Sequence, residues 1–342
     1  MDLRTLLVWR AVCRSAYYDV LSELQNSLRL MLADFVPSPD RLLSLVTRTR
    51  ALVTGELALS YLLRNARLAP RSLDIHIGNI FFDEFIDEFF NSSALIGYQT
   101  HISVLDHPEQ WISSRHITQT IQISLSNERS IAIHASASSS ACHSIACSPT
   151  TLGTTFVTEF CFATAYPLLT LNNRAIVCHD ELVDSMDLEL DVYDRLEEQG
   201  FSYEVEPTAW LEDASRRGQK NAAGETTCMR SLYICPQQVR RFGDHGSLLT
   251  FMDPLNVDLN ALKDGGIPPY GVMAAWRLRS PVICDEQCDE VDEILMPGML
   301  VAPVMFEADL SNTAVLPTLR TYSDTDISRP VAHVPRKRTR TI

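Results

Sequence analysis

The sequence of 342 residues lacks any apolar run long enough to cross a membrane. Its longest runs, such as Gly298–Phe306, are far shorter than the roughly 18–20 residues that a spanning helix requires. We also expect no secretory signal peptide, because Arg10 and Arg14 interrupt the apolar stretch at the N-terminus. The motifs Gly-x-Gly-x-x-Gly, Gly-x-x-x-x-Gly-Lys and Gly-x-Ser-x-Gly are missing too, which removes several classes of phosphate-binding and hydrolytic enzyme.

Basic residues are few: 29 Lys and Arg stand against 43 Asp and Glu, a formal net charge of −14. Such a surface repels a phosphate backbone, so nucleic acid is not an expected partner. Hydrophobic residues make up 46%, enough for a sizeable core. We expect a cytoplasmic protein. The basic cluster Arg336–Arg340 is a candidate nuclear-import signal, and its alternative interpretation is a solvated chain end.

Paired cysteine motifs are also scarce. The nine cysteines are odd in number and irregularly spaced, so we expect reduced thiols rather than a disulfide framework. Short zinc-like spacings occur, but no second pair follows any of them at the usual separation, and we predict no metal site. No cysteine is marked locally as an activated nucleophile. The short spacings are Cys142-His143 with Cys147, Cys228 with Cys235, and Cys284 with Cys288.

Periodicity predicts an α+β fold in which an N-terminal helical segment precedes a mixed sheet. Helices are expected at 3–35, 40–49, 56–64, 81–90 and 150–165, and strands at 51–54, 73–77, 96–104, 116–125 and 129–135. We predict four parts: a helical segment (1–49), an α+β domain (50–180), a mixed C-terminal portion packed on that domain (181–285), and an irregular tail, first acidic and then basic (286–342).

The segment 51–77 resembles the opening of the nucleotidyltransferase fold. In that family a strand ends in a Gly turn, a helix follows, and the next strand carries two carboxylates two positions apart. A third carboxylate comes from a later strand. Carboxylates two apart share one face of a strand, so they can hold the metal ions that bridge a triphosphate. Here the resemblance assigns nucleotide contacts to Gly55, Asp74, His76 and His134.

Three positions depart from that pattern. Glu56 stands where the family has Ser or Gly, and we expect its carboxylate to face and repel a phosphate. His76 and His134 replace two of the three acids, and imidazole is a poor ligand for magnesium. Asp74 is therefore the one weak catalytic candidate. A simpler interpretation of Asp74 and His76 is a pair of solvent-facing strand residues.

Across roughly residues 5–280, the order of several short motifs resembles a group of fungal, mostly basidiomycete, proteins with a nucleotidyltransferase-like region and F-box-like N-terminal helices. This resemblance implies a fold rather than an activity. The matching residues are Thr54–Leu59, Ser72–His76, Thr154–Thr155, Tyr166–Thr170, Cys235–Arg241, Asp244–Gly246 and Trp276–Leu278.

Three hypotheses of function follow. The first is a non-catalytic binding or scaffold protein on a degenerate nucleotidyltransferase-like fold, a pseudoenzyme without a cofactor. The second is a divergent nucleotidyltransferase that uses Asp74 with His76 or His134 and needs Mg²⁺ or Mn²⁺. The third is an F-box-type adaptor whose residues 1–35 would bind a Skp1-like protein, with packing against the β domain as the alternative role of these helices.

Overall fold

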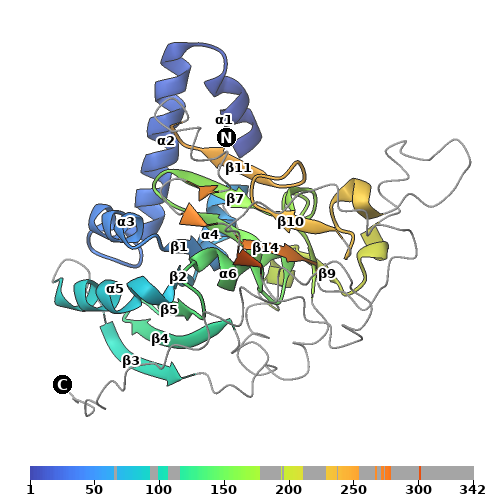
Figure 1. Ribbon diagram of the computed structural model, residues 1–342. Coiled ribbons are helices and arrows are strands. Elements are labelled where there is room, and N and C mark those ends of the chain that lie inside the picture. The colour runs from blue at the N-terminus through green and yellow to red at the C-terminus, as the bar shows by residue number, and fades with distance from the viewer. Residues whose placement is uncertain are drawn as a thin grey trace, which may run out of the picture. The chain divides into compact units, whose positions relative to one another are not determined.

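The computed structural model describes the chain except for residues 65–67, 93–98, 107–115, 178–193, 195, 211–228, 237, 254–265, 268–270, 273, 279–299 and 302–342. Residues Met1–Met305 form one compact unit (Figure 1). No helix among the described residues combines the length and the apolar character needed to span a membrane. The helices are α1 (Leu3–Arg10), α2 (Arg14–Leu32), α3 (Pro39–Arg48), α4 (Gly55–Leu63), α5 (Asn79–Asn91), α6 (Ala141–Ala146) and α7 (Pro167–Thr170).

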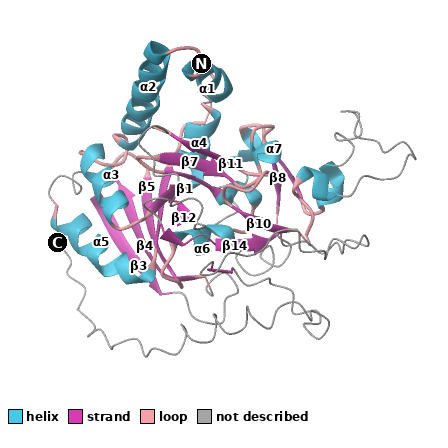
Figure 2. Ribbon diagram, turned by 45° about the horizontal axis from the view of Figure 1, so that its top comes forward, coloured by secondary structure: helices cyan, strands magenta, loops and turns pink. Residues whose placement is uncertain are grey.

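An eight-stranded mixed sheet organises the unit, in the order β11-β7-β6-β1-β2-β5-β4-β3 (Figure 2). Neighbouring strands are antiparallel except β2 and β5, which are parallel. This arrangement confirms the predicted α+β class with a mixed sheet. The strands are β1 (Leu52–Thr54), β2 (Ser72–Ile77), β3 (Gln99–Asp106), β4 (Ile117–Leu125), β5 (Ser130–Ser136), β6 (Thr155–Val157), β7 (Cys161–Thr164) and β11 (Leu248–Phe251).

Short strands complete the fold outside the main sheet. They form a three-stranded sheet in the order β10-β14-β15 and the pairs β8-β9 and β12-β13. Their bounds are β8 (Arg174–Ile176), β9 (Ser202–Glu204), β10 (Val239–Arg241), β12 (Gly266–Ile267), β13 (Gly271–Val272), β14 (Ala274–Arg277) and β15 (Leu300–Val301).

Each face of the main sheet has its own core, because successive strand residues point to opposite faces. On β1, Val53 belongs to the core under the N-terminal helices, and Leu52 belongs to the second core beneath α6 and β14. On β2, Leu73 and Ile75 join the first core. Asp74 therefore lies on the face that α6 covers.

The N-terminal helical segment packs on the first face of the sheet. The buried residues of α2 recur at four-residue steps, and Val20, Leu24, Leu28 and Leu32 lie in the same core as the strands. The predicted single helix 3–35 is divided, because Cys13 is the N-cap of α2 and its sulfur accepts a hydrogen bond from the Ala16 amide at 3.5 Å. The buried residues of α2 are Ala16, Val20, Leu24, Leu28 and Leu32.

The predicted helix at 150–165 is wrong. A 3₁₀ turn at Thr151–Thr154 leads instead into the hairpin of β6 and β7. The hydroxyl of Thr158 accepts hydrogen bonds from the amides of Phe160 and Cys161 at 3.2 and 3.0 Å, which closes the hairpin turn. The many β-branched residues of this segment favour strands, and that preference outweighs its helix-like apolar spacing.

The late strand β11 pairs with β7 and lies at one edge of the main sheet. It adds residues near 250 to a sheet whose other seven strands come from residues 52–164. The main sheet therefore includes chain from both sides of the domain boundary predicted at residue 180, and that boundary stays a prediction.

Candidate functional site

The four residues predicted to contact a nucleotide lie together on the face of the sheet covered by α6. Gly55 begins α4 directly after β1, and Asp74 and His76 lie on β2. His134 lies on the parallel neighbour β5, directly opposite His76 in the register. On β1, Thr54 is opposite Asp74. Local strand periodicity put the side chains on one face, and strand pairing brought them side by side.

Gly55 is in close contact with Asp74. Its φ of +68° lies in the left-handed region that other residues rarely adopt. A Cβ atom at this position would lie 1.8 Å from Oδ2 of Asp74, so no other residue fits without a rearrangement. Ser72 donates a hydrogen bond from its hydroxyl to the same oxygen at 3.2 Å.

The imidazoles of His76 and His134 lie side by side, with ring centroids 4.5 Å apart. Nε2 of His134 is 4.0 Å from Oδ1 of Asp74, and the side chains of these two residues are only 18% and 23% exposed. These are not open, solvent-facing strand positions.

The Nδ1 atoms of both rings have hydrogen-bond partners. Nδ1 of His76 lies 2.9 Å from the Ser144 hydroxyl on α6, and Nδ1 of His134 lies 2.9 Å from the Thr120 hydroxyl on β4. Burial, and then the neighbouring His134, hold the pKa of His76 well below its usual value. His76 is therefore a neutral group at physiological pH and supplies no charge to the site.

Glu56 differs from the expectation that its carboxylate faces a phosphate. The side chain is buried, and Oε2 accepts hydrogen bonds from the backbone amides of Arg71 and Ser72 at 2.7 and 3.3 Å. The carboxylate thus joins the first turn of α4 to the start of β2. Sequence reasoning missed this role because the two segments are fifteen residues apart along the chain.

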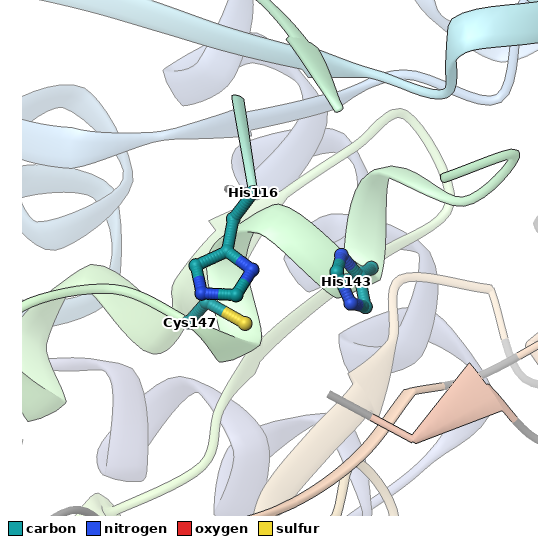
Figure 3. Close-up of side chains that lie close together, drawn as sticks. All are labelled: His116, His143 and Cys147. Carbon is teal, nitrogen blue, oxygen red and sulfur yellow. The ribbon is translucent and has the colours of Figure 1, made fainter. Parts of the chain in front are cut away.

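A second polar cluster is formed by His143 and Cys147, from α6 and its C-cap, and by His116, which directly precedes β4 (Figure 3). The three potential ligand atoms all lie within 4.8 Å of one another, and all three residues are buried. His143 and Cys147 are four residues apart on α6 and its C-cap. That spacing is visible in the sequence, but nothing local indicates that His116, just before β4, completes the group.

Burial lowers the pKa of His143 to about 4, so its imidazole is neutral at physiological pH. Within the described part of the chain, Nδ1 of His143 is buried without a hydrogen-bond partner. A neutral, buried ring nitrogen of this kind is able to bind a metal ion without first losing a proton.

The later motifs of the resemblance meet in a third buried cluster around Arg240. The Arg240 guanidinium makes two hydrogen bonds to the Asp244 carboxylate, at 2.7 and 3.0 Å, and is fully buried. Its Cζ lies 4.8 Å from the centroid of the Tyr166 ring, and Trp276 donates a hydrogen bond from Nε1 to the Tyr166 hydroxyl at 3.0 Å. Gly246 donates from its amide to Asp244 at 2.9 Å.

The Tyr-Pro, Cys-Pro-to-Arg, Asp-x-Gly and Trp-Arg-Leu motifs thus place these residues around one ion pair in the second core. They satisfy one another's charges and hydrogen bonds. Their geometry accounts for them as a structural unit rather than a reactive site.

Among the described residues, Asp74, His76 and His134 do not form a set whose ligand atoms all lie within 4.8 Å, and the cluster at His116 does. Cys228, Cys284, Cys288 and the basic cluster Arg336–Arg340 lie outside the described residues. Comparisons with family models, curated proteins and solved structures find no match to this chain.

Proposed function

We propose that this chain is a non-catalytic binding protein built on a nucleotidyltransferase-like fold. Three features support the fold: a Gly turn at positive φ between β1 and α4, an acid on the following antiparallel strand β2, and a later strand β5 parallel to β2. Asp74 contacts the Gly55 turn, as an acid that served a bound triphosphate would.

The observation that carries the absence of catalysis is the pair of adjacent imidazoles beside Asp74. His76 and His134 occupy the positions of the second and third carboxylates. Two divalent cations and a polyphosphate need several anionic oxygen ligands, and Mg²⁺ accepts imidazole poorly. Asp74 supplies the one carboxylate among the four candidate residues. A single carboxylate does not offset the mutual repulsion of two such cations.

The hydrogen bonds of the site also support a non-catalytic role. Ser144 and Thr120 each bond a ring nitrogen, and Ser72 bonds Asp74. The Glu56 carboxylate, in the first turn of α4, is buried and accepts hydrogen bonds from the amides of Arg71 and Ser72. The site is thus organised around internal contacts.

A protein partner is the binding target that the surface supports best. The net charge of −14 disfavours a nucleic acid. The end of α1 exposes Val8 and Trp9, by 63% and 42%, and the turn that follows exposes Val12, by 70%. Exposed apolar patches mark sites where proteins meet other proteins, and Trp is enriched at such interfaces. They also favour the F-box-type adaptor as a second candidate, although the inward residues of α1 and α2 are used in the main core.

Isothermal titration of the full chain with ATP in the presence of Mn²⁺ tests the proposal. We expect no saturable heat beyond that of a titration with ATP alone, because the metal cage is incomplete. Saturable, Mn²⁺-dependent binding that Asp74→Asn abolishes would instead contradict the proposal and favour the divergent nucleotidyltransferase.

The matched control is Asp83→Asn, which removes an exposed carboxylate on α5. If Mn²⁺-dependent binding survives in this control and is lost in Asp74→Asn, the binding belongs to the Asp74 site and the proposal is wrong. Circular dichroism of both variants establishes that each one is folded.

A further inference from the structure

The buried cluster of His116, His143 and Cys147 has the composition of a transition-metal site. Two imidazoles and one thiolate are nitrogen and sulfur donors, which zinc prefers and which magnesium and calcium avoid. All three residues are buried, with relative exposures of 2%, 9% and 6%. Figure 3 shows the His116 ring beside the sulfur of Cys147.

The backbone holds the three residues in place. Cys147 donates a hydrogen bond from its amide to the carbonyl of His143 at 3.3 Å, so both ligands project from one turn of α6. Ser140 caps the start of this helix by accepting a hydrogen bond from the Cys142 amide at 3.2 Å. The carbonyl of His116 accepts from the Ala137 amide at 2.8 Å, which ties the start of β4 to the end of β5.

The dimensions suit a zinc ion. Zinc–nitrogen bonds of about 2.0 Å and zinc–sulfur bonds of about 2.3 Å place tetrahedral ligand atoms roughly 3.3–3.6 Å apart. The potential ligand atoms lie at most 4.8 Å apart. Side-chain rotations that move these atoms together by about 1.2–1.5 Å would bring them to the separation found in a zinc site.

Nδ1 of His143 gives independent support. It is fully enclosed and has no hydrogen-bond partner within the described part of the chain. Buried polar atoms nearly always have a partner in a native protein, and a bound metal ion is one of the partners that accounts for an exception. The neighbouring ring of His116 lies 5.4 Å away, centroid to centroid, at 64°.

We infer that His116, His143 and Cys147 bind a zinc ion. Three protein ligands leave the fourth tetrahedral position for water or another donor. The site is distinct from the Asp74 group, although α6 joins them, because Ser144 on the same helix contacts His76.

The test begins with metal analysis of the full chain. The protein is stripped with a chelator, reloaded with zinc, separated from free metal and analysed for zinc per chain. We expect one zinc per chain. A preparation that retains no zinc would overturn the inference.

Cobalt substitution then identifies the ligands. A cobalt-loaded chain should show a thiolate-to-cobalt charge-transfer band and visible bands of tetrahedral intensity. Cys147→Ala should lose the charge-transfer band and bind zinc more than about tenfold more weakly. Cys142→Ala is the matched control, because it removes another buried thiol of α6 that lies outside the group, and it should keep both properties.

X-ray absorption of the zinc-loaded, unsubstituted chain provides a measurement that does not depend on whether the variants fold. The expected zinc shell contains one sulfur and two imidazoles. A shell without sulfur, or a charge-transfer band that survives in Cys147→Ala, would show that the metal lies elsewhere. Because the probe is zinc without nucleotide, this result is separate from the Mn²⁺–ATP titration.

Discussion

At the scale of single residues, the ion pair of Arg240 and Asp244 stands out because both charged side chains are almost completely removed from water, with exposures of 0% and 1%. The guanidinium also donates to the carbonyl of Ala165 at 2.7 Å, and its Cζ lies 5.3 Å from the ring centroid of Tyr233. Every one of these contacts compensates part of the cost of removing a charge from water.

Asp244→Ala should therefore destabilise the protein by about 3–5 kcal/mol, because it leaves the Arg240 charge buried without its carboxylate. Denaturant unfolding followed by circular dichroism measures the change. Arg241→Ala is the control, since the Arg241 side chain makes no ion pair with any described residue, and its cost should stay within about 0.5 kcal/mol. Equal costs for both variants would contradict this account of the cluster.

His76 makes stability depend on pH. Its pKa is ordinary, near 6.5, in the unfolded chain and well below that value in the folded protein. As the pH falls below 6.5, the unfolded chain binds a proton that the folded protein does not. Stability should therefore decline from neutrality toward about pH 5, by up to about 1.4 kcal/mol per pH unit for this proton.

Urea unfolding at several pH values measures this decline in the unsubstituted chain and in His76→Gln. We expect the substitution to remove part of the slope. His101→Gln, which changes an exposed histidine of β3, should leave the slope unaltered. An unchanged slope in His76→Gln would mean that the site does not hold this imidazole neutral.

At the scale of elements, α2 shows how one helix divides between the core and the surface. Leu24 is completely buried and Leu30 is 73% exposed. The hydroxyl of Tyr61 on α4 donates to the carbonyl of Leu24 at 3.2 Å, so the two helices are joined by a polar contact as well. This packing is the role of the N-terminal segment that the structure shows.

Leu24→Ala should cost about 2–5 kcal/mol of stability, because it opens a cavity between α2 and the sheet. Leu30→Ala is the same chemical change on the exposed side of the same helix and should cost no more than about 0.5 kcal/mol. Thermal or denaturant unfolding measures both. A Leu24→Ala variant as stable as Leu30→Ala would show that α2 is not part of the core.

Helix α6 contacts the Asp74 group and supplies two of the three residues of the His116 cluster, on the second face of the sheet. Ser144 contacts His76, and His143 with Cys147 approaches His116. The Ser/Ala-rich segment before α6 supplies its N-cap, Ser140. The Ser/Ala composition of residues 135–140 indicates a break between regular elements. It does not predict α6, because a helix of only six residues is too short to show a periodic pattern.

At the scale of the whole molecule, two cores lie on opposite faces of one sheet, and the candidate residues share the second face. Alternation along β2 and β5 made this placement predictable, since Leu73, Ile75, Ile131 and Ile133 all face the first core. The hairpin at 150–165 was not predictable in this way, because its apolar spacing also suits a helix and only its pairing with β1 and β11 decides for strands.

The sequence by itself determined most of the elements through β5 and the alternation that puts Asp74 and His76 on one face of β2. These depend on periodicity and turn chemistry within about ten residues. Only the tertiary structure decided that β5 pairs with β2 and that His116 joins α6. It also decided that Glu56 bonds the amides of Arg71 and Ser72, and that Tyr166 and Trp276 join the ion pair of Arg240. Such contacts join segments separated by many residues. Their partners are selected by packing and burial of the whole fold, which no local pattern records.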